Sequence, residues 1–232
     1  EEFLPEGVEA DTRVSNQWSD PTIDRLVLDD FEDGDEDTAV ASNGGAVTST
    51  LEDMEEGILN DGDTQFEWRS SDPMNGMTLS TGASEDTRGL VFGWEEEGNW
   101  ALALPAYQQD WLAYTSISLR FCQQTRHSNT RSWDDLIGFS ITLIDADGVE
   151  VSLPLRAHAE AESPYGRTGL GGGSGWANEW QTARLRLLDF EAGGTGIDLS
   201  RIATLRLDFG GDYGGGPGRA GLDDIELIAE DP

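Results

Sequence analysis

The feature that most restricts the fold of this chain is a two-residue alternation of apolar and polar side chains. It is clearest in "TSISLRFCQQ" (115–124), and it recurs in "WQTARLRLLDF" (180–190) and "RIATLRLDFG" (201–210). Such alternation is typical of β-strands that have one buried face. No stretch of a dozen residues shows the 3.6-residue repeat of an amphipathic helix. The sequence therefore predicts an all-β protein.

Turn signals divide the chain into short strands. The 29 glycines cluster in "GLGGGSG" (169–175), "EAGGTG" (191–196) and "FGGDYGGGPG" (209–218). "IGFSITLIDADGVEVSLPLRA" (137–157) reads as two strands joined by a turn at 146–148, and "DLSRI" (198–202) reads as a short helical turn. Ten to twelve such strands predict a two-sheet antiparallel β-sandwich of the jelly-roll type, with few or no helices.

The ends of the chain differ in character. Residues 1–22 are polar and unpatterned, which predicts a disordered or extended N-terminal tail, and strand-like patterning then runs to the end. No composition shift or repeat divides the remainder. We therefore expect residues 23–232 to form a single β-sandwich domain.

The charge of the chain excludes several functions. The formal net charge is −32, and the basic residues are all arginine. A field of this sign repels nucleic acid and anionic membrane, whereas it suits a saline medium or the binding of cations. The single cysteine, Cys122, excludes an internal disulfide and is expected to be buried. No run of 18 apolar residues suggests insertion into a membrane.

Four segments together resemble the galactose-binding-like β-jelly-roll. They are the opening "LVLDDFEDGD" (26–35), "EWQTARLRLLDFE" (179–191), "GIDLSRIATLRLDFGG" (196–211) and "GRAGLDDIELI" (218–228). The residues that match the pattern of that family are Trp180, Leu185, Leu187, Asp189, Phe190, Asp198, Leu199, Ser200, Ile202, Leu222, Asp223, Asp224, Ile225 and Leu227. The match is good over about 25–35 and 178–229, whereas residues 36–177 show only general sandwich patterning.

This resemblance implies a secreted or cell-surface module. The fold underlies many non-catalytic carbohydrate-binding modules of secreted polysaccharide-degrading enzymes, so a polysaccharide or glycan is the expected partner. An adhesion or structural module that binds a surface protein is the alternative, and a jelly-roll glycosidase or lyase is a third reading. The fold itself does not decide between them.

The same resemblance implies a structural calcium ion. The first and last strands of this fold are neighbours, and each carries an Asp-Asp pair here, at 29–30 and 223–224. Ca²⁺ takes six to eight oxygen ligands. We expect it to be held by Asp30 and Glu32 from the first strand region and by Asp223 or Asp224 from the last. Alternatively, one Asp of each pair simply faces solvent.

Aromatic side chains in loops predict where a sugar would bind. Flat rings stack on pyranose faces, and polar side chains bond the hydroxyl groups. The segments "QQDW", "TRHS", "SPYG" and "SGWA" combine the two kinds of side chain. The expected ligand-binding residues are Trp111, Arg126, His127, Tyr165 and Trp176. Core packing or loop anchoring is the alternative for each aromatic residue. The two histidines lack zinc-site spacing, and no nucleophile elbow is present.

Overall fold

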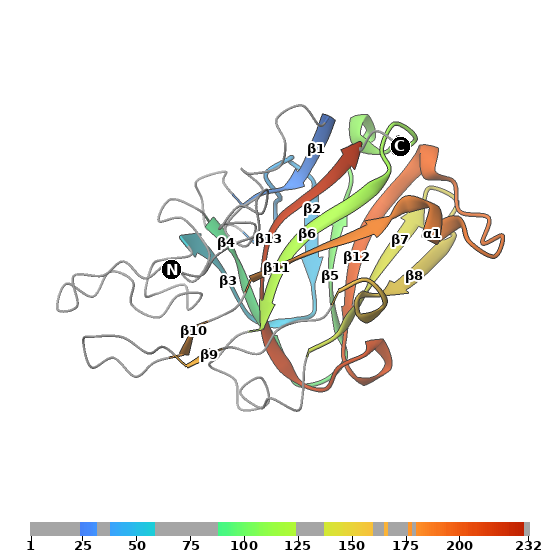
Figure 1. The fold of residues 1–232 in the computed structure, drawn as a ribbon. Coiled ribbons are helices and arrows are strands. Elements are labelled where there is room, and N and C mark those ends of the chain that lie inside the picture. Colours follow the sequence, from blue (N-terminus) through green and yellow to red (C-terminus); the bar gives the residue numbers. More distant parts are fainter. Residues whose placement is uncertain are drawn as a thin grey trace, which may run out of the picture.

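The computed structural model describes residues 24–31, 38–58, 88–123, 137–159, 165–166, 176–177 and 180–229. Two antiparallel sheets face one another across a shared core (Figure 1). The longest helix in these ranges has five residues. The predicted all-β sandwich is thus confirmed. No helix of the described part is long and apolar enough to cross a membrane.

The larger sheet has six strands and contains both ends of the described chain. Its order is β11-β6-β13-β4-β3, and β1 pairs with β13 outside this path. The bounds are β1 Asp24–Asp29, β3 Glu52–Ile58, β4 Arg88–Trp94, β6 Ser116–Gln123, β11 Trp180–Arg186 and β13 Gly218–Ala229. The twelve-residue β13 is the centre of this sheet, because β1, β4 and β6 all pair with it.

The second sheet has five strands in the order β2-β5-β12-β7-β8. They are β2 Ala46–Ser49, β5 Gly98–Ala103, β7 Phe139–Asp145, β8 Glu150–Pro154 and β12 Ile202–Phe209. A two-residue ladder joins β9 Tyr165–Gly166 to β10 Trp176–Ala177. The helical turns are α1 Leu187–Glu191, η2 Ala106–Gln108, η4 Leu155–Ala157, η5 Leu199–Arg201 and η6 Gly211–Tyr213.

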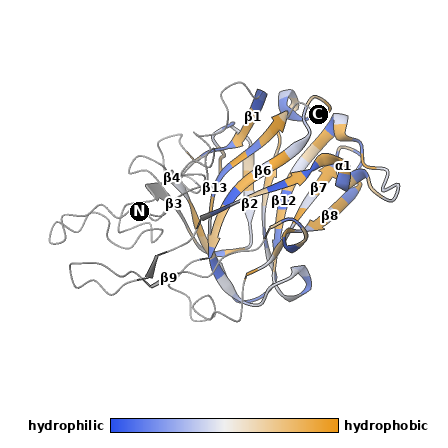
Figure 2. Cartoon of the chain, viewed as in Figure 1, coloured by the Kyte–Doolittle hydropathy of each residue, from blue (hydrophilic) through white to orange (hydrophobic). Residues whose placement is uncertain are grey.

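Aromatic rings from both sheets meet in the core. The rings of Phe92 on β4 and Phe209 on β12 lie 4.9 Å apart, and those of Phe121 on β6 and Phe139 on β7 lie 5.7 Å apart in an edge-to-face arrangement. Such pairs add to the free energy gained by burial. Figure 2 shows hydrophobic residues along the strands that face this core, such as β6 and β13.

Two local predictions from the sequence are confirmed. β7 and β8 form a hairpin whose turn has Gly148 at φ 82°, and Oδ1 of Asp145 accepts the backbone N–H groups of Asp147 and Val149 at 2.9 Å. The "DLSRI" turn is η5, and the side chain of Asp198 caps it by accepting the N–H of Ser200 at 3.0 Å. Both turns are fixed by a carboxylate that bonds nearby backbone, as is usual for Asp.

Candidate functional site

The first and last strands are neighbours, as the sequence predicted. β1 runs antiparallel to β13, with Asp24 opposite Ala229 and Asp29 opposite Ile225. The two Asp-Asp pairs therefore come to one place in the sheet. Both strands are irregular there, because the β1 register shifts before Asp29 and the β13 register shifts after Asp223.

Backbone strain marks the same place. Phe31 has φ 57° and Asp224 has φ 47°, and within the described ranges these are the only non-glycine residues in the left-handed region. This conformation is costly for a bulky residue. Bulges and strained residues are frequent beside binding sites. The junction of β1 with β13 is therefore the first candidate site.

The last Asp-Asp pair lies against a buried arginine. Nη1 of Arg120 on β6 lies 2.7 Å from Oδ2 of Asp223, and both side chains are 0% exposed. Oδ2 of Asp224 lies 3.4 Å from the same nitrogen and is partly exposed. The guanidinium charge offsets the repulsion between the two carboxylates. Asp223, predicted as a calcium ligand, is thus an ion-pair partner of Arg120 in this structure.

The first Asp-Asp pair stabilises a turn. Oδ1 of Asp29 accepts the backbone N–H groups of Phe31 at 3.2 Å and Ser42 at 3.1 Å. The N–H of Asp30 donates to Oγ of Ser42 at 3.0 Å. Burial raises the pKa of Asp29 to about 7, although these hydrogen bonds act in the opposite direction. Asp29 thus anchors the end of β1 to the segment that contains Ser42.

The sequence analysis missed Glu226, which is 2% exposed on β13. Burial raises its pKa to about 7; the neighbouring Arg25 opposes this effect, and the Asp224 carboxylate adds to it. Nη1 of Arg25 lies 3.6 Å from Oε2. The alternation of "LDDIELIA" could have indicated its position, because it places Glu226 on the opposite side of β13 from Ile225 and Leu227, which face the core.

Polar residues form two rows across β11, β6 and β13. Thr182, Arg120 and Asp223 lie opposite one another in one row. Arg184, Ser118 and Glu226 form the next row. The alternate β6 residues Ile117, Leu119 and Phe121 belong to the core, so these rows lie on the other side of the sheet. We call these six residues the polar face.

Ser118 and Glu226, which belong to the polar face, each carry a buried polar atom of interest. Among the described residues, neither Oγ of Ser118 nor Oε1 of Glu226 has a hydrogen-bond partner, although both atoms are buried. Ser118 and Glu226 lie directly opposite one another across β6 and β13. Buried polar atoms are nearly always bonded, to protein, water or a ligand.

The structure describes some of the predicted calcium ligands but not all of them. Asp30 and Asp224 lie near enough to Glu226 for each to raise its pKa. Within the part of the chain that the structure describes, no three His, Cys, Asp or Glu residues form a group that could hold a metal ion. Glu32 lies outside the described residues. Calcium at this junction stays a prediction.

The predicted sugar-binding residues are not assembled by the described structure. Trp111 is 0% exposed, and its indole N–H donates to the carbonyl of Gln108 at 2.8 Å. Its prediction as a stacking platform is therefore corrected, because the core covers the ring. Tyr165 and Trp176 lie on the paired strands β9 and β10. Arg126 and His127 lie outside the described residues.

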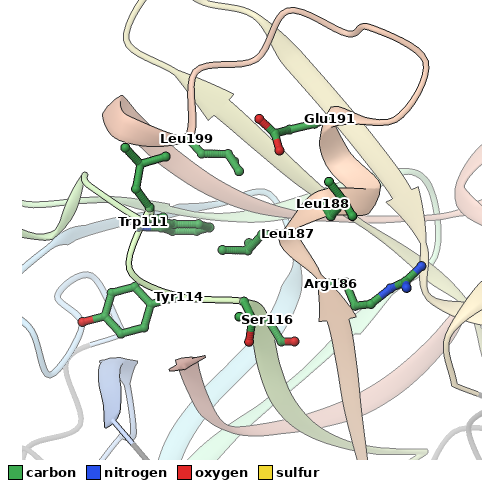
Figure 3. Close-up of a pocket in the computed structure, with 10 residues that line it drawn as sticks. Trp111, Tyr114, Ser116, Arg186, Leu187, Leu188, Glu191 and Leu199 are labelled. Atoms are coloured by element: carbon green, nitrogen blue, oxygen red, sulfur yellow. The ribbon is translucent and has the colours of Figure 1, made fainter. Parts of the chain in front are cut away.

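A separate pocket of about 420 Å³ lies at one end of the sandwich. It is formed by the loop before β6, the end of β11, α1 and η5, and Trp111 and Leu187 face one another at its centre (Figure 3). Leu112 and Leu188 also line it, and they are 68% and 67% exposed. The pocket adjoins the polar face at Ser116, two residues before Ser118 on β6.

No protein-family model matches the sequence, and no curated protein matches it. Among solved structures, the chain is similar to a family 11 carbohydrate-binding module from Clostridium thermocellum in complex with a β-1,3-1,4-mixed-linked tetrasaccharide. The identity is 15%, the TM-score is 0.48, and the match covers 88% of this chain and 95% of that one.

A family 30 carbohydrate-binding module of a Clostridium thermocellum cellulosomal cellulase is similar over 67% of this chain and 80% of its own, at 14% identity and a TM-score of 0.44. An exo-β-agarase is similar over 89% of this chain and 25% of its own, at 14% identity and a TM-score of 0.48. At these identities the likenesses concern the fold alone.

Proposed function

We propose that this chain is a non-catalytic, extracytoplasmic carbohydrate-binding module whose polar face contacts a glycan. One observation carries the proposal. The buried Oγ of Ser118 and Oε1 of Glu226 lie on facing residues and have no hydrogen-bond partner among the described residues. A buried acceptor left without a bond costs about 1–3 kcal/mol. A ligand that supplies hydroxyl groups would remove this cost.

The chemistry of the polar face fits sugar hydroxyls. A carboxylate oxygen accepts a hydrogen bond, and a serine hydroxyl both donates and accepts. Two hydroxyls of one sugar ring could serve the two residues together. Arg25 and Arg184, both partly exposed, flank Glu226. Long arginine side chains reorient readily, so they could admit a ligand and then bond it.

The roles of the other carboxylates support a binding function rather than catalysis. Glycoside hydrolysis needs two carboxyl groups that are free to transfer protons or attack the sugar. Here Asp223 bonds Arg120, and Asp29 bonds the backbone of Phe31 and Ser42. Both therefore act in structural contacts.

Calcium at the junction of β1 and β13 belongs to the same proposal. Asp30 and Asp224 would supply ligands from the two strands, with Glu32 as a further one. The strained backbone at Asp224 and the carboxylate charge around Glu226 support it. Bound Ca²⁺ would offset the repulsion between the carboxylates. Asp223 does not fit this role while its Oδ2 accepts from Arg120.

The alternative function, binding of a protein partner, is favoured by a different observation. Leu112 and Leu188 are large, exposed and apolar, and they line one pocket. Exposed apolar patches often mark protein-binding surfaces. This surface and the polar face can be tested separately.

The polar face is tested by Ser118→Ala and Glu226→Gln. Each variant keeps the size of the side chain nearly unchanged and alters the unpartnered polar atom. We expect each to weaken retention on whichever polysaccharide the native chain binds, while neither lowers the unfolding midpoint below that of the native protein. Glu150→Gln, an exposed site on β8 of the other sheet, is the matched control. Unchanged retention in both polar-face variants would place the glycan elsewhere.

A further inference from the structure

The pocket beside α1 combines an apolar interior with an apolar rim. Trp111, Leu187 and Leu199 line it from the core, and Leu112 and Leu188 line it from the surface. The two exposed leucines come from segments far apart in the sequence, the loop before β6 and α1. Leaving both exposed costs hydrophobic free energy that burial by a partner would recover. A volume of about 420 Å³ lies in the range of sites that hold a small ligand or a side chain.

The charges around the pocket are negative. Among the described residues that line it, Arg186 is the only base, and its guanidinium is bonded to Asp189 at 2.7 Å and 3.1 Å. Glu191 also lines the pocket and is exposed. Asp110 is exposed beside Trp111, and burial together with the nearby Asp24 carboxylate raises the pKa of the Tyr114 phenol. The rim therefore favours a cationic group.

We propose that this pocket docks a polypeptide segment of a partner protein in which an apolar side chain stands next to Lys or Arg. The apolar side chain enters between Leu112 and Leu188, and the cation reaches Glu191. This surface adjoins the polar face at Ser116 but shares no residue with it, and the peptide and the glycan are therefore assigned to different side chains.

Charge complementarity selects this occupant over the alternatives. A second copy of this chain also carries a formal charge of −32, so two copies repel one another at long range. A basic segment is attracted by the same field, which raises its association rate. A glycan offers hydroxyl groups, but exposed leucines give them no hydrogen-bond partner.

The test uses fluorescein-labelled peptides and the full chain. One series places Leu, Ile, Phe or Trp between lysines, a second replaces the lysines by glutamates, and a third replaces the apolar residue by serine. Fluorescence anisotropy measures each affinity at low and high salt. We expect binding only in the first series. The double variant Leu112→Ser/Leu188→Ser should bind about tenfold more weakly or worse, because the apolar contact is lost.

Two controls separate this site from general attraction to an acidic protein. Val40→Ser removes an exposed apolar side chain elsewhere and should leave the affinity unchanged. Methyl-labelled leucine NMR should show peptide-dependent shifts at Leu112 and Leu188. Equal affinity of the double variant and the native chain, or no binding by any peptide of the first series, would overturn the proposal. Loss of polysaccharide retention in the double variant without peptide binding would also overturn it, by assigning the pocket to the glycan.

Discussion

Arg120 and Asp223 lie opposite one another on β6 and β13, with Nη1 2.7 Å from Oδ2 and no solvent exposure of either side chain. The bulge at Asp224 separates this pair from the row of Ser118 and Glu226. Taking two charges out of water is expensive, and the opposite charge of the partner offsets that cost for each of them.

Removing either partner should therefore be strongly destabilising. We expect Arg120→Met and Asp223→Leu each to lower the free energy of unfolding by about 3–5 kcal/mol, because a buried charge is left behind. The double variant should recover much of that loss. Urea unfolding measures all three. Arg201→Met, which removes an exposed arginine paired with Asp147 and Asp198, is the control and should lower the free energy of unfolding far less, because solvent screens exposed ion pairs. Single variants as stable as the native chain would show that the pair is not buried.

Stability should fall as the pH rises from about 4.5 to about 7. Burial raises the pKa of Glu226 from 4.5 to about 7, so between these values the folded state holds a proton that the unfolded state has lost. The free energy of unfolding then decreases with rising pH over this window and is flat above it. For Glu226 the loss is on the order of 3 kcal/mol at most.

This pH dependence is measured by urea unfolding in chelator, so that no metal competes for the nearby carboxylates. Glu226→Gln should flatten the profile between pH 5 and about 7. Asp29, whose pKa burial also raises to about 7, should account for a remaining slope of the same sign. A profile that Glu226→Gln leaves unaltered would contradict the burial of this carboxylate.

Calcium should raise the melting temperature if it bridges β1 and β13. A ligand that binds only the folded state stabilises it. We expect Asp30→Asn and Asp224→Asn each to remove most of the difference between melting curves in calcium and in chelator. Asp212→Asn, at an exposed site in η6, controls for general screening of the negative charge. Identical curves in calcium and chelator for the native chain would rule out the bridging ion.

The thiol of Cys122 should report opening of the larger sheet. The side chain is 0% exposed, and burial raises the pKa of the thiol far above its ordinary value. Reactivity requires an accessible thiolate. A thiol reagent should therefore label the native protein only at the rate at which β6 becomes exposed, and labelling should accelerate in urea. Rapid labelling in native buffer would show that β6 is accessible from its outer side.

The sequence predicts best the structural features that depend on local residue patterns. Alternation identifies β6, β11 and β12, turn residues identify the turns at 146–148 and 198–202, and the family resemblance implies the pairing of β1 with β13. The strands and turns depend on residues that are close in sequence. The pairing of β1 with β13 follows from a motif that is typical of one strand topology.

Features that depend on contacts between residues far apart in the sequence could not be predicted. Trp111 stands between the polar segment "QQD" and a turn, and its position depends on the distant η5, since its backbone N–H donates to the carbonyl of Leu199. Alternation places Arg120 and Glu226 on the outer side of their strands, but no local pattern indicates that this side is buried. Because burial of this side could not be predicted, the buried atoms of Ser118 and Glu226 without hydrogen bonds were found only in the structure.

The most direct test of the proposed function is retention of the native chain on a panel of insoluble polysaccharides and a glycan array, in calcium and in chelator. We predict retention on at least one class of glycan, with weaker retention in chelator. Absence of retention on every glycan of the panel in calcium would contradict the carbohydrate-binding function.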